Sequence, residues 1–241
     1  MKIINFKTMN IKISIILITA ALLLGFRDDG VNDKIKDARF LEYCLDKFDR
    51  NGDGILTLDE ALAVKIISIP YSRITSFEGI ELFANLEDLY CESSYKLKKN
   101  LDVSRNTKLK RLNCSATNLK TLDVSKNTEL IDLKCSLNQL TSLDISQNTE
   151  LTVLRCEDNQ LTSLDASKNT KLTELHCGYN QFTKKALNEM FKNLPSVTKG
   201  IIGIMKNPDA QKCRKKIAEK KGWEVHVWEI LMIVPDDVII N

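Results

Sequence analysis

Six residues between positions 49 and 60 offer oxygen atoms at the spacing that a calcium ion requires. Within a twelve-residue loop, side-chain oxygens come at positions 1, 3 and 5, a backbone carbonyl at 7, a hydroxyl at 9 and a carboxylate at 12. These residues are Asp49, Asn51, Asp53, Ile55, Thr57 and Glu60. Gly54 stands at position 6, where such a loop turns sharply. The spacing therefore predicts one calcium site.

This EF-hand pattern needs a helix on each side of the loop. Apolar residues at helical spacing predict the first helix over residues 34–48, with Asp33 as its cap, and a second helix from Leu58 towards Val64. Sensor EF-hands come in pairs, whereas this sequence holds a single loop. We therefore expect calcium, if bound, to be structural; the alternative is a metal-free turn between two helices.

A 21-residue repeat dominates the chain after this loop. Leucines recur at 109, 130, 151 and 172, and again at 112, 133, 154 and 175, followed by a cysteine two residues later. The unit is L-x-x-L-x-C-x-x-N-x-L, the leucine-rich-repeat pattern. Each unit predicts a short strand that buries its leucine and cysteine, so stacked units must share one core. We expect six repeats, the first of them atypical.

The expected fold is therefore α/β: a leucine-rich-repeat solenoid with a parallel sheet on one face and a cap at each end. The ladder asparagines are Asn138, Asn159 and Asn180, which we expect to bond neighbouring coils through the backbone. Thr117 takes that position in one copy, so a weaker or shifted rung is expected there.

The chain divides into four expected segments. Residues 1–26 form a signal peptide, in which Lys2, Lys7 and Lys12 precede an uncharged apolar run. Residues 27–63 form the EF-hand-like helical cap and 64–183 the repeats. Residues 184–241 form an α/β cap, with helices over 186–194 and 208–221 and strands over 200–204 and 223–227. The apolar run at 230–234 is too short to span a bilayer.

Charge gives little indication of a nucleic-acid partner. The formal net charge is +3, and without the three signal-peptide lysines the mature chain is left at about zero. Basic residues between 212 and 221 are expected to cover the exposed face of a terminal helix.

The remaining reactive side chains also favour structural roles. Five cysteines, at positions 91, 114, 135, 156 and 177, occupy the inward strand position, where a buried thiol is expected over a disulfide or a metal ladder. The pairing of Cys44 and Cys213 stays open. Aspartates at 102, 123, 144 and 165 recur once per turn, which indicates bonds to the local backbone. Neither His176 nor His226 has a nucleophile or metal-ligand partner at a recognisable spacing, so an enzyme is the least expected class.

The outward side of the strands is the expected ligand-binding face. Its candidate residues are Tyr90, Asn113, Lys134, Arg155, His176 and Tyr179. Aromatic residues and arginine are over-represented in binding hot spots, so a protein or glycan partner is expected here. The alternatives are a solvated face without a ligand and a calcium-stabilised structural component of the cell envelope.

The layout resembles a family of secreted leucine-rich-repeat proteins of Bacteroidetes-type bacteria that carry an N-terminal EF-hand-like calcium loop. The motifs that carry the resemblance are the loop at 48–56, the E-G-I-x-x-F-x-N-L-x-x-L segment at 78–89, the repeats from Leu101, and the closing segments at 186–195 and 221–223. The resemblance covers the chain after about residue 33. It implies an exported binding or surface protein, periplasmic, at the cell surface or secreted, with no single known ligand.

Overall fold

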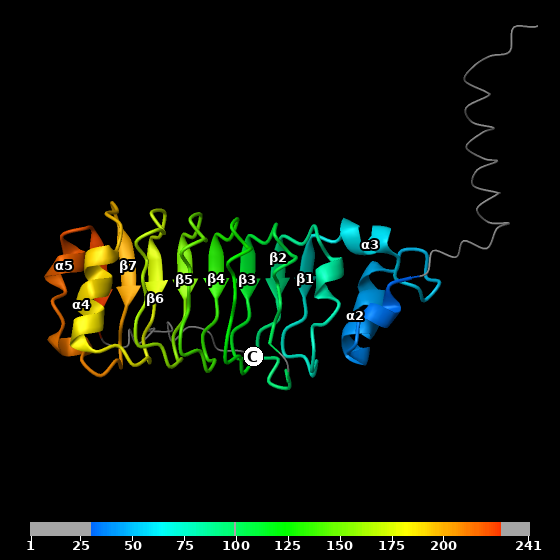
Figure 1. Cartoon of the computed structure of the whole chain (residues 1–241), viewed down its shortest axis with the longest axis horizontal. Coiled ribbons are helices and arrows are strands. Elements are labelled where there is room, and N and C mark those ends of the chain that lie inside the picture. Colours follow the sequence, from blue (N-terminus) through cyan, green and yellow to red (C-terminus); the bar gives the residue numbers. More distant parts are fainter. Residues whose placement is uncertain (1–29, 99, 228–241) are drawn as a thin grey trace, which may run out of the picture.

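One parallel sheet of eight strands runs the length of the molecule. The structure is a computed structural model that describes residues 30–98 and 100–227 of the chain. Its strands are β1 (Ile66–Ser68), β2 (Asp88–Tyr90), β3 (Arg111–Asn113), β4 (Asp132–Lys134), β5 (Val153–Arg155), β6 (Glu174–His176), β7 (Gly200–Gly203) and β8 (Trp223–His226). Each strand pairs only with its neighbours in the sequence, so the sheet order is the chain order (Figure 1).

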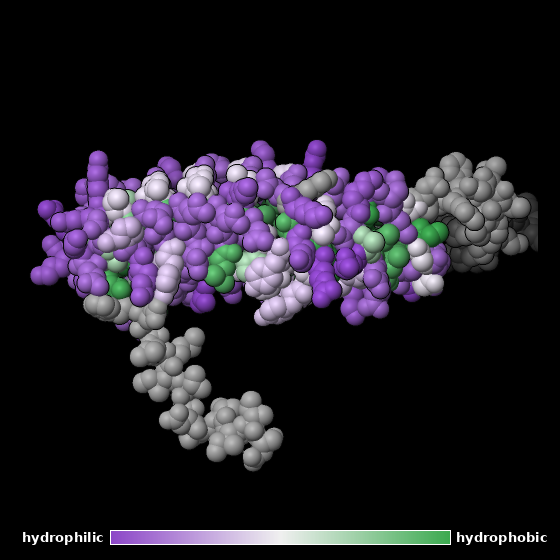
Figure 2. All heavy atoms as spheres, turned by 90° about the horizontal axis from the view of Figure 1, so that it is seen from below, coloured by the Kyte–Doolittle hydropathy of each residue, from purple (hydrophilic) through white to green (hydrophobic). Residues whose placement is uncertain are grey.

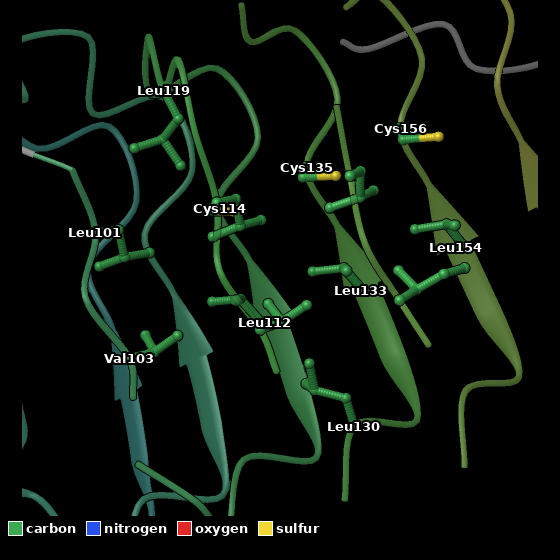
Figure 3. Close-up of a cluster of buried hydrophobic side chains, with 14 of the residues drawn as sticks. Leu101, Val103, Leu112, Cys114, Leu119, Leu130, Leu133, Cys135, Leu154 and Cys156 are labelled. Carbon is green, nitrogen blue, oxygen red and sulfur yellow. The ribbon is translucent and has the colours of Figure 1, made fainter. Parts of the chain in front are cut away.

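The strand register follows the repeat without a slip. Leu89, Leu112, Leu133, Leu154 and Leu175 are direct partners along the sheet. All five are buried, and the same leucine and cysteine positions recur from coil to coil in Figure 3. A strand of three residues cannot bury one face alone. Here the side chains of each strand pack against those of the neighbouring coils, which share one core. The predicted leucine-rich-repeat solenoid is confirmed.

The cysteines are buried free thiols, as predicted. All seven are unpaired and buried, including Cys44 and Cys213, whose pairing the sequence left open. Burial raises the pKa of Cys114 to about 12 and lifts the pKa values of its ladder neighbours Cys91 and Cys135 in the same direction. The thiols are therefore protonated at neutral pH and pack as small hydrophobic side chains.

The ladder asparagines join successive coils. Asn159 donates from Nδ2 to the carbonyls of Cys135 (3.0 Å) and Cys156 (3.2 Å), and its Oδ1 accepts from the Leu140 amide (2.9 Å). Asn138 and Asn180 repeat this pattern. The predicted coil-to-coil role is confirmed.

Thr117 makes the weaker rung that the sequence predicts. Its hydroxyl donates to the Cys114 carbonyl of its own coil (2.6 Å) and lies 3.2 Å from Asn138 Oδ1, which accepts from the Thr117 amide (3.1 Å). Among the described residues it keeps no side-chain bond to the preceding coil, because a threonine lacks the two-pronged amide.

A second row of buried asparagines lies in the connectors. Asn127 donates to the carbonyls of Val103 and Asn106, both at 2.9 Å, and Asn148 donates to those of Val124 and Asn127 in the same way. Asn106 and Asn169 continue the row. These are the asparagines of the x-Asn-Thr connector. They give each coil a second set of hydrogen bonds to the coil before it.

The recurring connector aspartates bond the local backbone, as predicted. Oδ1 of Asp102, Asp123, Asp144 and Asp165 accepts from the amide two residues later at 2.8–2.9 Å. These bonds lower the pKa of Asp123 and Asp144, with the backbone bond as the largest cause. The side chains serve the turns.

Two predicted helices differ in the structure. The first helix, α2 (Ala38–Phe48), begins four residues later than expected, and its cap is Asp37 instead of Asp33, which lies in the short 3-10 helix η1 (Asn32–Lys34). Asp37 caps the helix because its carboxylate accepts from the backbone amides of Arg39 and Phe40. It also accepts from the Thr75 amide (2.7 Å) in the first coil.

The helix predicted over 208–221 is wrong as one element. It is divided into a 3-10 turn, η3 (Ala210–Lys212), and the short helix α5 (Lys216–Glu219). The extended Cys213 separates them, because burying its side chain turns the chain inward.

The C-terminal segment extends the sheet. Helix α4 (Lys184–Asn193) links β6 to β7 and buries Leu187, Met190 and Phe191 in the common core. Strands β7 and β8 then continue the parallel register. At the other end of the molecule, α2 and α3 (Leu58–Ala63) lie beside β1 (Figure 1).

Two sequence predictions lie outside the described residues: the signal peptide at 1–26 and the apolar run at 230–234. Among the described residues, no helix has the length and apolar character to cross a membrane.

Candidate functional site

The loop between α2 and α3 is shaped by its own side chains. Asp49 accepts at Oδ1 from the Gly52 amide and at Oδ2 from the Gly54 amide, both at 2.8 Å. Asn51 accepts from the Asp53 amide at 3.1 Å. Gly52 and Gly54 hold φ angles of 70° and 77°, which other residues adopt only at a cost. The sequence thus places three side-chain oxygen donors around one turn.

Glu60 links the two ends of this loop. Its Oε1 accepts from the Arg50 amide (2.8 Å), and its Oε2 accepts from the amide and the hydroxyl of Thr57, both at 2.9 Å. Thr57 and Glu60 together form a capping box at the start of α3. The Thr57 amide, followed by the Arg50 amide, lowers the pKa of Glu60 despite the opposing effect of burial. The carboxylate is therefore ionised at neutral pH.

The donor chemistry of the loop fits a hard divalent cation. Asp49, Asn51, Asp53, Thr57 and Glu60 each offer a side-chain oxygen, and Glu60 Oε1 keeps a lone pair beyond its bond from the Arg50 amide. In the described part of the chain, no three acidic, histidine or cysteine side chains converge on one point. Here the Glu60 carboxylate accepts from the Arg50 and Thr57 amides.

Residues upstream of α2 also hydrogen-bond to the loop. The sequence patterns did not predict these contacts. The Val31 amide donates to the Leu56 carbonyl, and the Leu56 amide donates to Asn32 Oδ1, both at 2.8 Å. Asn32 Nδ2 donates to the Gly54 carbonyl at 2.9 Å. No local signal marks Asn32, because its partners lie more than twenty residues away.

Aromatic rings join the helical segment to the first coil. Phe40 of α2 packs edge-on against Phe77 with 5.3 Å between ring centroids, and Phe48 packs against Phe83 at 5.8 Å. Phe40 is fully buried in the core that continues along the repeats. The helix before the loop is therefore packed directly against the first coil of the solenoid.

The second candidate site is the outward face of the sheet. Tyr90, Asn113, Lys134, Arg155 and His176 are direct partners on successive strands and form one row. Gly203 and His226 extend this row onto β7 and β8. The sequence placed His226 in a separate cap strand, since nothing local shows that the cap continues the sheet.

Charges on this face pair with each other. Arg155 Nε donates to Glu174 at 2.9 Å, and His176 lies 3.2 Å from Glu174 and 3.7 Å from Glu157. Lys134 lies 3.5 Å from Asp132. Ser136 donates to Glu157 instead of His176, so this cluster holds no nucleophile paired with a histidine base.

A groove of about 440 Å³ lies beside this row, at the C-terminal ends of strands β4 and β5. It is lined by Ser115, Lys134, Ser136, Leu137, Arg155, Glu157, Asp158, Tyr179 and Met205. Lys134, Arg155 and Tyr179, all predicted for the binding face, thus come together, whereas Tyr90 and Asn113 lie further along the sheet.

Leu137 is a groove residue that the sequence patterns missed. Leu137 and Tyr179 are 56% and 39% exposed, and both have positive φ angles, 56° and 52°. Each precedes a ladder asparagine, a position that holds alanine at 116 and aspartate at 158. The available signal in the sequence was a large apolar side chain directly before a ladder asparagine.

Comparisons with known proteins give structural likeness only. No protein-family model matches the chain, and no curated protein matches it significantly. Among solved structures, it is similar to the functional domain of InlJ from Listeria monocytogenes, which includes a cysteine ladder, at 24% identity over 80% of this chain and 55% of that one, with a TM-score of 0.33.

Two further structures are similar in the same way. A leucine-rich-repeat protein of Leptospira interrogans matches at 20% identity over 71% of this chain and 50% of that one, with a TM-score of 0.49. Internalin C2 of Listeria monocytogenes matches at 20% identity over 73% and 87%, with a TM-score of 0.48. The chain thus spans about half the length of the first two. The leucine-rich-repeat fold rests on the strand register and the asparagine ladder described above.

Proposed function

We propose that this chain is an exported, non-catalytic binding protein that recognises a protein or glycan through the outward face of its sheet. We further propose that the N-terminal loop holds one structural calcium ion. The export step rests on the signal-peptide pattern at 1–26, and it places the protein in the periplasm, at the cell surface or outside the cell.

The observation that carries the binding proposal is the groove beside the residue row. Lys134, Arg155 and Tyr179 come from three different coils, yet they line one depression together with the exposed Leu137. Tyrosine and arginine beside an exposed apolar side chain are the composition of an interface hot spot. Leu137 and Tyr179 occupy the same turn position of their coils, where Ala116 and Asp158 share the positive φ angle, so these two coils differ in presenting large side chains at the turn.

One observation favours a second candidate function, a structural component of the cell envelope without a discrete ligand. Lys134, Arg155 and His176 already have acidic neighbours within 4 Å on the same face. A partner would have to compete with these pairs or contact the groove between them. The two functions differ in whether changes in the groove alter binding.

Paired variants test the proposed face. Arg155→Ala with Tyr179→Ala should weaken a partner found on panels of extracellular proteins and glycans at least tenfold, because truncated hot-spot residues each cost more than about 1 kcal/mol. Lys126→Ala with Lys168→Ala, two exposed connector lysines, is the control and should stay within about twofold. Equal affinities for both double variants would place binding elsewhere.

The calcium loop has a separate test with a matched control. Calcium should raise the melting temperature of the wild type, and Glu60→Gln should remove this shift because position 12 supplies a bidentate carboxylate. Asp59→Asn loses the same charge at an exposed loop position that supplies no ligand, so it should keep the shift. The calcium-dependent difference is the readout, since Glu60→Gln also weakens the capping box.

The effect of calcium on partner affinity distinguishes a structural ion from an ion that controls binding. Partner affinity that is unchanged in chelator at a temperature where the protein stays folded supports structural calcium. Affinity that collapses while the fold persists would show that calcium gates binding.

A further inference from the structure

Positive charge is concentrated at the C-terminal end of the solenoid. Residues 184–222 hold ten lysines and one arginine against three acidic residues, a formal excess of eight positive charges. Residues 30–183 hold 20 basic and 23 acidic residues, an excess of three negative charges. The small net charge of the whole chain hides this separation.

The fold gathers these charges on one surface. Helix α4 and the segment before α5 lie together, and the Arg214 amide donates to Asn188 of α4 at 2.7 Å. Two adjoining grooves of about 310 and 640 Å³ share Arg214 and Ile217, and the first is also lined by lysines of α4. We call this surface the basic end; its defining residues are Lys184, Lys185, Lys192, Arg214, Lys215, Lys216 and Lys220.

Most of the basic end takes part in no ion pair within the described residues. Lys192 pairs with Glu189 at 2.8 Å. No ion pair within the described residues engages the other six defining residues. Lys184 and Lys185 also occupy the first two positions of α4, where the helix dipole disfavours cations. Asp209 offsets part of this effect by accepting from the Lys184 amide at 3.2 Å, and the exposed ammonium groups stay open to a negatively charged partner.

The orientation of the basic end separates it from the binding face. Leu187, Met190 and Phe191 of α4 are buried in the core beneath the sheet, so the exposed side of α4 faces away from the outward strand row. Figure 1 shows α4 and α5 at the end of the molecule opposite α2 and α3, and hydrophilic residues predominate over much of the molecule in Figure 2. A partner on the basic end leaves the sheet face open.

We propose that the basic end docks onto the surface of a bilayer rich in anionic phospholipid. Ten of the eleven cations in this segment are lysines, which bind headgroup phosphates as point charges. Half-buried Ile217 lies among them and offers apolar surface to the headgroup layer. The only aromatic residue between 184 and 222 is Phe191, which is fully buried, so the segment has no platform on which nucleic-acid bases could stack.

Vesicle binding by the full chain tests this proposal. The readout is the ratio of partition coefficients between vesicles with about one-third phosphatidylglycerol and vesicles of phosphatidylcholine alone, which cancels any contribution of the apolar N-terminal run. Each basic residue near an anionic surface contributes about fivefold. Reversing Lys184, Lys185, Lys216 and Lys220 to glutamate should therefore lower the ratio more than tenfold, and raised salt should weaken wild-type binding.

The matched control reverses four exposed lysines elsewhere: Lys108, Lys120, Lys126 and Lys168. It has the same net charge and should retain at least a third of the wild-type ratio. Equal losses in both variants would show a response to net charge alone and overturn the proposal, as would no loss in either. Thermal unfolding checks the fold, and a set of four Lys→Gln changes at 184, 185, 216 and 220 should give an intermediate loss.

Competition separates lipid from nucleic acid. A single-stranded oligonucleotide should not displace the protein from vesicles when phosphate concentrations are equal. Displacement that the four basic-end glutamates abolish would identify a nucleic-acid surface and overturn the lipid assignment. Neither result bears on partner binding at Arg155 and Tyr179, so the two proposals fail independently.

Discussion

At the scale of single residues, the cysteine row shows how a reactive side chain becomes a packing unit. The ladder thiols at 91, 114, 135, 156 and 177 are fully buried behind the sheet. Burial raises the pKa of the Cys156 thiol well above its ordinary value, with weaker contributions from the neighbouring cysteines and Glu157. A leucine would be larger at this position, so the cysteine sets how closely successive coils fill the core.

Alkaline unfolding tests the buried thiols. An unfolded thiol ionises near pH 8.5–9, whereas folded Cys114 holds its proton to about pH 12. The stability from this raised pKa is complete below about pH 8.5 and is lost as pH rises towards 12, by at most about 1.4 kcal/mol per pH unit for one thiol.

The wild type should therefore lose free energy of unfolding more steeply above pH 9 than Cys114→Ala. Val124→Ala, a buried truncation without a thiol, is the control and should keep the wild-type slope. Parallel curves for all three proteins, measured by urea unfolding, would contradict the predicted linkage.

At the scale of the elements, asparagines decide how coils attach. Each of the strands β1 to β6 has only three residues, so few sheet bonds hold a coil, and the two asparagine rows add buried bonds between successive coils. Asn207 continues the first row: it donates to the Cys177 and Ile204 carbonyls and accepts from the Phe182 amide. The repeat period ends before this residue, so its role emerged only with the structure.

Asn207→Ala should destabilise the protein by about 2–4 kcal/mol, because it leaves a buried amide and two carbonyls without partners. Gln211→Ala changes an exposed side chain nearby and should stay within about 0.5 kcal/mol. Chemical denaturation measures both. If Asn207→Ala lowers the free energy of unfolding no more than Gln211→Ala does, Asn207 does not contribute to the stability of the asparagine ladder.

At the scale of the whole molecule, the solenoid is one-dimensional. Strands contact only their sequence neighbours, so a perturbation at one end must pass from coil to coil. The ends also differ: an acidic loop lies at the start, and the basic end lies beside β8. The loop that we propose for calcium and the basic end thus lie at opposite ends of the molecule, with the sheet between them (Figure 1).

Hydrogen exchange tests this directional coupling. Chelating calcium should speed amide exchange most in residues 30–63, less in β1 and β2, and not measurably in β5 to β8, because local opening fades with distance along a repeat array. Asp59→Asn should behave as the wild type, and Glu60→Gln should exchange rapidly with or without calcium. Uniform acceleration along the chain would show a single cooperative unit.

Much of the fold could be predicted because the repeat ties each residue to a local pattern. The 21-residue period fixed the register, the buried leucines and thiols, and the turn aspartates, whose partners lie two residues away. The weak rung at Thr117 followed from side-chain chemistry alone. The prediction of a calcium loop is equally local, since its candidate ligands lie within twelve residues, and it stays a prediction.

Contacts across long sequence separations were decided only by the tertiary structure. Asp37 displaced Asp33 as the helix cap because Thr75 reaches it from the first coil, 38 residues away. Leu137 and Tyr179 share a groove, and Lys184 and Arg214 share a surface, because stacking brings together positions that are remote in the chain. The sequence by itself determined the repeating coil and marked the loop that we propose for calcium. The tertiary structure decided which exposed side chains become neighbours, since side-chain proximity across coils depends on how they stack.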